Sequence, residues 1–159
     1  MEGDYYDSLV ILELYLKEHK KNLTFKSYCN NLLNYLSKRA QPLISALVLG
    51  EIELAFLRTP SSNQLQHTML AINSFLSKCK ILSITPESIQ FASDILKEDL
   101  RLKQHSEDVL HFSIAATHKI NFLSIEIGFL SNIVIIRKAK EVGIRIIETD
   151  KLIKEADKR

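Results

Sequence analysis

The segment Leu43-Ile44-Ser45-Ala46-Leu47-Val48-Leu49-Gly50-Glu51 decides the fold, because an apolar strand runs directly into a helix that carries an acid. Residues Leu43–Ser45 predict the strand, and residues from about Ala46 to Leu57 predict the helix. Pro42 marks the boundary before the strand. Glu51 is surrounded by apolar residues in the sequence, so we expect it to be partly buried and to need a partner.

The rest of the chain repeats this alternation of short apolar strands and helices. The predicted strands are Gly3–Tyr6, Leu43–Ser45, Lys80–Ile84, Asn121–Ile125 and Ile144–Ile147. The predicted helices are 8–19, 24–39, 46–57, 64–78, 86–102, a helix from Ser106 onward, and 131–142. This pattern is typical of a three-layer α/β/α fold, in which helices cover both faces of a central parallel sheet of about five strands. We expect one domain that spans residues 1–159.

Capping residues set several helix boundaries. Thr85 is predicted to cap a helix that has Pro86 at its first position. Ser106 is predicted to cap the next helix, whose first turn carries two acids. Gly143 is predicted to end the last helix, because glycine is the usual residue at that position.

The composition is that of a globular domain, with 46% hydrophobic and 25% charged residues. A net charge of +2 excludes an overall basic field, so nucleic-acid binding would need a local patch. The longest apolar stretch, Leu43–Leu57, is interrupted by Glu51 and Glu53. No segment offers the ~18–20 uninterrupted apolar residues of a membrane span.

The expected location is the cytoplasm. The N-terminal residues Met1-Glu2-Gly3-Asp4 are acidic and polar, unlike a signal peptide. Cys29 and Cys79 each fall in a helical pattern and have no CxxC spacing. We therefore expect buried or half-buried thiols in a reducing compartment, and neither a disulfide nor a metal site.

Four acids follow or lie near the predicted strands: Asp7, Glu51, Asp108 and Glu126. Asp7 and Glu126 come at the carboxyl ends of strands, and Asp108 lies in the first turn of a helix. Glu51 is about two helical turns past its strand and would have to point back across the sheet. Since the functional crevice of an open parallel sheet lies beyond the carboxyl ends of its strands, we expect the four carboxylates to converge on a divalent metal.

Structural roles for single residues stay open beside this hypothesis. Asp7 could be a helix N-cap, Asp108 a first-turn acid that favours the helix dipole, and Glu126 a surface acid. His111 lies three residues after Asp108 on the same helix face, which could bring it near the site, but packing or an interhelix hydrogen bond is the favoured interpretation. Among the scattered basic residues, Arg58 and Arg101 are the candidates for contact with a nucleic-acid backbone.

Four short segments occur in a characteristic order. They are Asp7-Ser8 before Leu-Val-Ile-Leu, Ile44-Ser45 through Glu51, Asp108-Val109-Leu110-His111-Phe112-Ser113-Ile114-Ala115, and Leu123-Ser124-Ile125-Glu126 followed by Phe129. In combination they resemble the PIN-domain nucleases, including the VapC-like toxins of VapBC toxin–antitoxin pairs. The resemblance extends over roughly residues 5–153.

The resemblance implies a metal-dependent endoribonuclease that cleaves RNA, uses Mg²⁺ or Mn²⁺, forms a homodimer and is neutralised by a small antitoxin protein. On this hypothesis Asp7, Glu51 and Asp108 ligate or orient the main metal. Glu126 would hold a second ion or order a metal-bound water. Ser8 and Ser124 would donate hydrogen bonds to these carboxylates or to waters.

The sequence departs from the family at its last segment, and this keeps other functions open. Glu126 stands where the family usually has Asp, Ser124 where it has Thr, and Gly128 where an acid is frequent. One alternative is therefore a catalytically weak or inactive PIN-like domain that binds RNA or protein. Another is a phosphotransferase with Asp7 as nucleophile, but Ser8 follows Asp7 where that class usually has a second acid.

Overall fold

The computed structural model describes residues 3–8, 10–12, 38, 40–60 and 63–149. Within them, five strands form one sheet in the order β3-β2-β1-β4-β5, and every pair is parallel. The strands are β1 Gly3–Tyr6, β2 Gln41–Ser45, β3 Lys80–Leu82, β4 Asn121–Ser124 and β5 Ile146–Glu148. The predicted parallel sheet of about five strands is confirmed.

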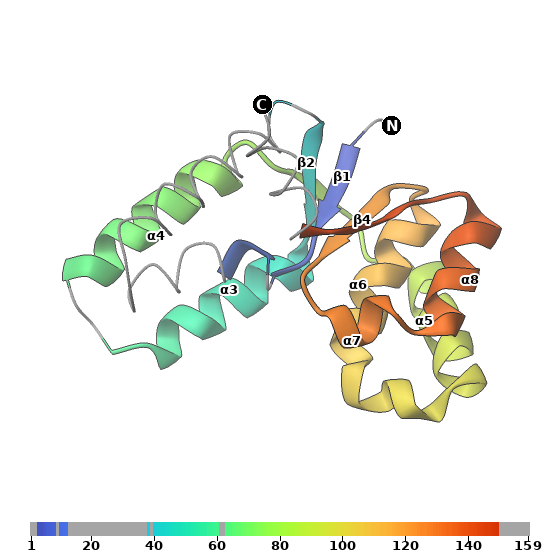
Figure 1. Ribbon diagram of the computed structural model, residues 1–159. Helices are drawn as coiled ribbons and strands as arrows, with labels where there is room; N and C mark the ends of the chain where they lie inside the picture. Colours follow the sequence, from blue (N-terminus) through green and yellow to red (C-terminus); the bar gives the residue numbers. More distant parts are fainter. Residues whose placement is uncertain (1–2, 9, 13–37, 39, 61–62, 150–159) are drawn as a thin grey trace.

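Helices cover both faces of the sheet. They are α3 Ala46–Arg58, α4 Asn63–Leu76, α5 Pro86–Glu98, the 3-10 helix η2 Leu100–His105, α6 Ser106–Thr117, α7 Ile127–Leu130 and α8 Ile133–Val142. Figure 1 shows α3 and α4 on one side of the sheet and α5, α6 and α8 on the other. This is the three-layer α/β/α architecture that the alternating pattern predicts.

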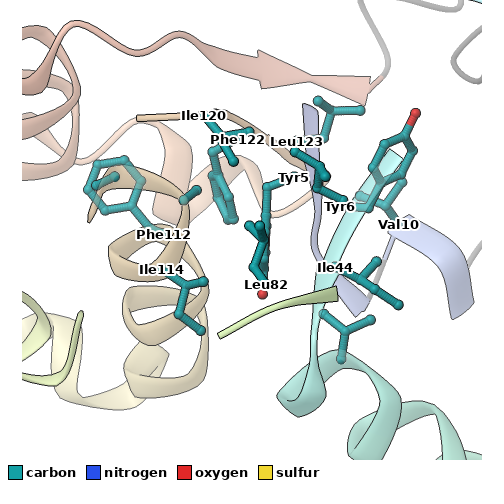
Figure 2. Close-up of a cluster of buried hydrophobic side chains, with 14 of the residues drawn as sticks. Tyr5, Tyr6, Val10, Ile44, Leu82, Phe112, Ile114, Ile120, Phe122 and Leu123 are labelled. Carbon is teal, nitrogen blue, oxygen red and sulfur yellow. The ribbon is translucent and has the colours of Figure 1, made fainter. Parts of the chain in front are cut away.

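Two adjacent tyrosines on the central strand β1 show how both faces are filled. Successive strand residues point to opposite faces, so Tyr5 and Tyr6 enter different layers. Tyr5 stacks on Phe122 with ring centroids 6.1 Å apart, and Tyr6 packs against Phe75 of α4 at 5.6 Å. Figure 2 shows Tyr5, Phe122 and Phe112 on one side of the sheet, with Tyr6 and Val10 on the other.

Several predicted element ends are wrong by a few residues. The helix predicted for 86–102 ends at Glu98, because the Asp99 side chain accepts a hydrogen bond from the Arg101 amide and starts η2. His105, not Ser106, precedes the first residue of α6 and makes no side-chain cap. Cys79 follows α4 and is half-buried, whereas the sequence pattern placed it inside the helix.

The segment after β4 also differs from the prediction. A short helix, α7, lies between the strand predicted for Asn121–Ile125 and the helix predicted for 131–142, where no element was predicted. Asn132 then caps α8 by accepting a hydrogen bond from the Val134 amide, so α8 begins at Ile133 and not at Ser131. Gly143 ends α8 with a φ of 78°, in the left-handed region that favours glycine, as the sequence predicts.

Some predictions lie outside the described residues. The helix predicted for 8–19 begins at Ser8, but residues 9 and 13–19 are not described. Of the helix predicted for 24–39, only Lys38 is described, and Cys29 lies outside. The single domain over residues 1–159 therefore stays a prediction. Within the described part of the chain, none of the helices is both long and apolar enough to span a bilayer.

Candidate metal centre

Asp7 is the buried acid at the carboxyl end of the central strand β1. Its side chain is 1% exposed. The Ser124 hydroxyl donates to Asp7 Oδ2 at 2.9 Å, and the Ser8 hydroxyl donates a longer hydrogen bond to Oδ1 at 3.4 Å. The Asp7 amide donates to the Leu123 carbonyl at 3.2 Å, which fixes the residue between β1 and β4. Both serines thus have the carboxylate contacts predicted for them.

Glu51 reaches the same place from α3. It is half-buried, and its Oε2 lies 2.9 Å from Nε2 of His111 on α6. Burial raises the pKa of Glu51, but hydrogen bonds from His111 and Ser8 and the charge of His111 outweigh it, so the pKa lies below its ordinary value. The carboxylate is therefore ionised at neutral pH.

His111 lies between the two carboxylates and is 1% exposed. Its Nε2 is 2.9 Å from Glu51 Oε2 and 3.8 Å from Asp7 Oδ1. On the other side of the ring, Nδ1 lies 2.8 Å from the Tyr5 hydroxyl, which in turn lies 2.8 Å from the Ser45 hydroxyl. The imidazole is thus held from both ends, and only its Nε2 faces the acids.

The charge state of His111 follows from these contacts. Burial lowers the pKa of the imidazole, but the hydrogen bond that it donates to Glu51 and the nearby charges of Asp7, Glu51 and Asp108 raise the pKa by more, so the net shift is upward. When His111 is protonated, its imidazolium is a positive charge between Asp7 and Glu51 and offsets their repulsion.

One ligand atom from each of Asp7, Glu51 and His111 lies within 4.8 Å of the other two. Two buried or half-buried carboxylates and one imidazole are donors that suit a divalent cation. The residues present therefore fit a metal of the kind that the sequence predicts. Among the described residues, no other group of three or more His, Cys, Asp and Glu side chains brings its ligand atoms this close together.

Asp108 lines the same pocket from the first turn of α6 but bonds to a different neighbour. Its Oδ2 lies 3.2 Å from Nδ1 of His105. Burial and the charge of Asp7 raise the pKa of Asp108 to about 6, although His105 and His111 oppose the rise. This carboxyl group therefore exchanges its proton close to neutral pH.

The acids open into a pocket of about 380 Å³ on the α3 and α6 side of the strand ends. The pocket is lined by Asp7, Ser8, Leu12, Glu51, Leu54, Ala55, Arg58, Glu107, Asp108 and His111. Arg58 places a cation beside the acids, as the sequence interpretation allowed. Arg101 instead pairs with Asp99, with Nη2 and Oδ2 2.8 Å apart. A larger hollow of about 430 Å³ between α8 and β5 contains one acid, Glu148, and no such cluster.

Glu126 is the predicted acid that does not line this pocket. It precedes α7, and its amide donates to the Ser124 hydroxyl at 3.2 Å. Its Oε1 lies 3.4 Å from the position that a Cβ on Gly128 would occupy, so the carboxylate lies over the start of α7. Ser124 therefore links Glu126 to Asp7 through the Glu126 backbone.

Two residues of the site, Tyr5 and Ser45, carry a signal that the sequence interpretation did not use. Tyr5 and Asp7 are two residues apart in an extended segment and so face the same way. Ser45 ends the neighbouring strand β2 at the same edge. His111 was expected to pack or to form an interhelix hydrogen bond, and it does form one to Glu51. That bond also places it inside the acid cluster.

The comparisons with known proteins identify related folds. No protein-family model matches the sequence, and a search of curated proteins finds no match. Among solved structures, a chain of VapBC2 from Rickettsia felis bound to a promoter DNA fragment has a TM-score of 0.60 and 18% identity, covering 82% of this chain and 93% of that chain. A chain of DNA-bound VapBC from Salmonella typhimurium has a TM-score of 0.54 and 15% identity, covering 94% and 99%.

A third structure, PAE2754 from Pyrobaculum aerophilum, has a TM-score of 0.56 and 11% identity and covers 99% of this chain and 96% of that chain. These matches span nearly the whole of each solved chain at low identity, so they show a shared fold. The fold of this chain is thus the one found in VapBC complexes, and the PIN-like fold predicted from the sequence is confirmed.

Proposed function

We propose that this chain is a metal-dependent endoribonuclease that uses Mg²⁺ or Mn²⁺ and whose site contains Asp7, Glu51 and Asp108. The observation that carries the proposal is the meeting of Asp7 and Glu51, from β1 and α3, in a pocket that Asp108 also lines. Carboxylates far apart in sequence rarely converge in a buried site unless something offsets their repulsion. A divalent cation is the usual partner.

The chemistry would use each residue differently. A bound divalent ion would lower the pKa of a water molecule and offset charge on the leaving oxygen. Asp7 and Glu51, both held by hydrogen bonds, would be fixed anionic ligands. Asp108, with a pKa of about 6, would accept the proton of the attacking water near neutral pH. Arg58 would contact a phosphate oxygen at the pocket edge.

RNA as substrate and the role of toxin rest on the resemblance to PIN-domain nucleases. Chains of the same fold occur in structures described as VapBC and as a toxin–antitoxin complex from Klebsiella pneumoniae. By analogy, we propose a small antitoxin protein as partner, a homodimer as the active form and the cytoplasm as the location. The proposed site chemistry does not depend on the identity of the substrate or of the partner.

A cleavage assay tests the proposed activity. Mixed RNA oligonucleotides are incubated with the protein and Mn²⁺ or Mg²⁺, with and without EDTA, and the products are separated on a gel. We expect cleavage that EDTA abolishes and that falls at least about 100-fold in Asp7→Asn and in Asp108→Asn. Glu107→Gln is the matched control, since Glu107 is exposed at the same pocket and has no role in the proposal. Equal cleavage by Asp7→Asn and wild type would refute the site.

A second candidate function is a PIN-like domain without catalysis that binds RNA or protein. The position of Glu126 favours it, because its carboxylate does not line the pocket of the other acids. On this alternative, the protein retards RNA on a native gel or captures a protein partner but cleaves no RNA with any divalent ion. Glu126→Asp separates the two functions. A gain of RNA cleavage in this variant would show that Glu126 is what makes the wild-type site inactive.

A further inference from the structure

His111 is the member of the cluster that the acid-based proposal leaves without a role. It is as buried as Asp7, and its Nε2 points at Asp7 Oδ1 and Glu51 Oε2, at 3.8 and 2.9 Å. Neither Asp108 nor Glu126 belongs to the compact donor group of the described residues, whereas His111 does. The donor group is therefore two carboxylates and one imidazole.

We propose that His111 Nε2 is a direct ligand of the divalent cation, together with Asp7 and Glu51, and that this nitrogen makes the site favour Mn²⁺ over Mg²⁺. The inference rests on the metal site of the proposed function and changes its ligand set. Asp108 is then not one of the three protein ligands of the ion. It acts beside the ion, on water or substrate.

The observed separations support this ligand set. Oxygen ligands of an octahedral Mg²⁺ or similar ion lie about 2.1 Å from it, so neighbouring ligands are roughly 3 Å apart and opposite ones roughly 4.2 Å apart. The pair formed by His111 and Glu51 is separated by 2.9 Å, the pair formed by His111 and Asp7 by 3.8 Å, and no pair exceeds 4.8 Å. The three side chains can therefore share one ion with small side-chain movements.

The orientation of the imidazole supports it independently. Histidines that bind metals usually have the second ring nitrogen in a hydrogen bond, which fixes the ring and directs the free nitrogen at the metal. Here Nδ1 contacts the Tyr5 hydroxyl at 2.8 Å, and Tyr5 is itself held by Ser45 and by stacking on Phe122. On binding, the cation replaces the Nε2 proton, which passes to solvent.

The preference for Mn²⁺ follows from the chemistry of the donors. Mg²⁺ is a hard ion that keeps oxygen ligands, including several waters. Mn²⁺ is the weakest binder of the first-row transition metals, but it exchanges a water for an imidazole nitrogen less reluctantly than Mg²⁺ does, so one imidazole shifts the balance modestly towards Mn²⁺. The ratio of Mn²⁺ affinity to Mg²⁺ affinity is therefore higher for a site with one imidazole and two carboxylates than for an all-oxygen site of the same charge.

Pulsed electron paramagnetic resonance of the full-length protein with one equivalent of Mn²⁺ tests the ligand directly. We expect electron spin echo modulation from one directly bound ¹⁴N nucleus, and its replacement by a ¹⁵N pattern when the protein is labelled with ¹⁵N-histidine. The labelled wild type needs no substitution, so the test holds even if a His111 variant fails to fold. The modulation should vanish in His111→Gln.

Two other histidines provide matched controls. His105 contacts Asp108 at 3.2 Å, so it is the nearest competing source of nitrogen. His118 contacts the Ser83 carbonyl at 2.8 Å, on another part of the molecule. We expect the modulation to persist in His105→Gln and in His118→Gln. Loss in His105→Gln with persistence in His111→Gln would overturn the assignment.

Calorimetric titration measures the preference between the two ions. We expect His111→Gln to weaken Mn²⁺ binding at least about tenfold and to weaken Mg²⁺ binding much less. Tyr5→Phe removes only the hydrogen bond to Nδ1, so it should weaken Mn²⁺ binding roughly 10-fold and keep the ¹⁴N modulation. Equal losses for both ions in His111→Gln would overturn the preference.

The outcomes separate this inference from the proposed function. Mn²⁺ binding and RNA cleavage without nitrogen modulation would overturn the ligand role of His111 and leave the nuclease proposal standing. Nitrogen modulation without RNA cleavage would support the ligand role and favour the non-catalytic alternative. Absence of binding of both Mn²⁺ and Mg²⁺ would overturn both proposals.

Discussion

Asp108 has a pKa raised to about 6 by burial and by the charge of Asp7, from an ordinary value of 3.8. Between these two pH values the folded protein holds a proton that the unfolded chain has lost, so the free energy of unfolding falls as pH rises from about 4 to about 6. Above pH 6 the folded protein therefore carries an unfavourable charge at this position. This cost is present only while no cation offsets it.

We expect Asp108→Asn to stabilise the metal-free protein at pH 7 by about 1–3 kcal/mol, because a shift of one pKa unit corresponds to about 1.4 kcal/mol. The gain should shrink towards zero at pH 4, and Asn can keep the contact with His105. Urea unfolding in EDTA at both pH values measures the effect. Glu107→Gln is the control, since this exposed neighbour should change stability little at either pH. A destabilised Asp108→Asn at pH 7 would contradict the prediction.

Ser124 supports the Asp7 carboxylate more strongly than an ordinary buried serine supports its neighbour. Its hydroxyl donates to Asp7 Oδ2 at 2.9 Å and accepts from the Glu126 amide at 3.2 Å. A hydrogen bond to a buried charge contributes about 1.5–3 kcal/mol, so Ser124→Ala should lower the free energy of unfolding by about 2 kcal/mol.

The matched control for Ser124→Ala is Ser113→Ala on α6. Ser113 is equally buried, but its hydroxyl donates to an uncharged acceptor, the Val109 carbonyl, at 2.7 Å. Its loss should cost about 1 kcal/mol or less. Urea titrations of both variants give the comparison, and equal losses would mean that Asp7 gains nothing from the Ser124 hydroxyl.

At the scale of the elements, Asp99 joins three helices. Its side chain accepts from the Arg101 amide and guanidinium at the start of η2, and from Asn132 Nδ2 at 3.0 Å, the residue that caps α8. The hydrogen bonds from Arg101 and Asn132 hold the pKa of Asp99 well below its ordinary value. The carboxylate thus ties the end of α5 to the start of α8.

We expect Asp99→Asn to lower the melting temperature at pH 7. Because the folded pKa is depressed, the stabilisation is complete above the ordinary pKa of about 4 and is lost as pH falls below it. The difference from wild type should therefore narrow in acid. Asp94→Asn is the control, since Asp94 lies exposed on α5 and bonds Lys97 at 3.3 Å. A difference between Asp99→Asn and wild type that does not depend on pH would contradict this account.

The same residue shows why helix ends were harder to predict than helices. The sequence pattern carried the helix through Asp99, because a local capping contact at that position depends on where Arg101 and Asn132 lie in space. The short helix α7 was missed for a similar reason: its four residues are fixed by packing of Phe129 and Leu130 in the core. The strands, by contrast, were found at nearly their observed positions, since buried parallel strands are continuous apolar runs.

At the scale of the whole molecule, the sheet order explains how much of the site could be predicted. Asp7 and Ser124 follow from strands β1 and β4, which are neighbours in the sheet, so the parallel-sheet rule alone places them together. The position of Glu51 could be predicted because β2 ends at Ser45 and α3, which carries Glu51, begins at the next residue, Ala46. The pocket shared by Asp7, Glu51 and Asp108 was thus predictable from topology.

The orientation of single side chains was not predictable in this way. Glu126 lies beside Ser124 in sequence, yet α7 turns its carboxylate over Gly128. His111 joins the acids because Tyr5, on a distant strand, fixes the far side of its ring. The position of His111 depends on a contact between segments more than 100 residues apart. The position of Glu126 depends on the start of α7, which no periodicity in the sequence marks.

A cation bound at the cluster of Asp7, Glu51 and His111 should stabilise the whole chain. A cation that binds the folded protein and not the unfolded chain stabilises it by about 2.7 kcal/mol at 100 times its dissociation constant. For a domain of this size, 1 kcal/mol corresponds to a change of about 2–4 °C in melting temperature, so Mn²⁺ should raise it by roughly 5–10 °C. Mg²⁺ at the same concentration should raise it less, and EDTA should reverse both effects. The rise should disappear in Asp7→Asn, which removes the more buried of the two carboxylate ligands, and persist in Glu107→Gln. If Asp7→Asn showed the same rise as wild type, the cation would bind elsewhere, and the cluster of Asp7, Glu51 and His111 would be held together by the imidazolium alone.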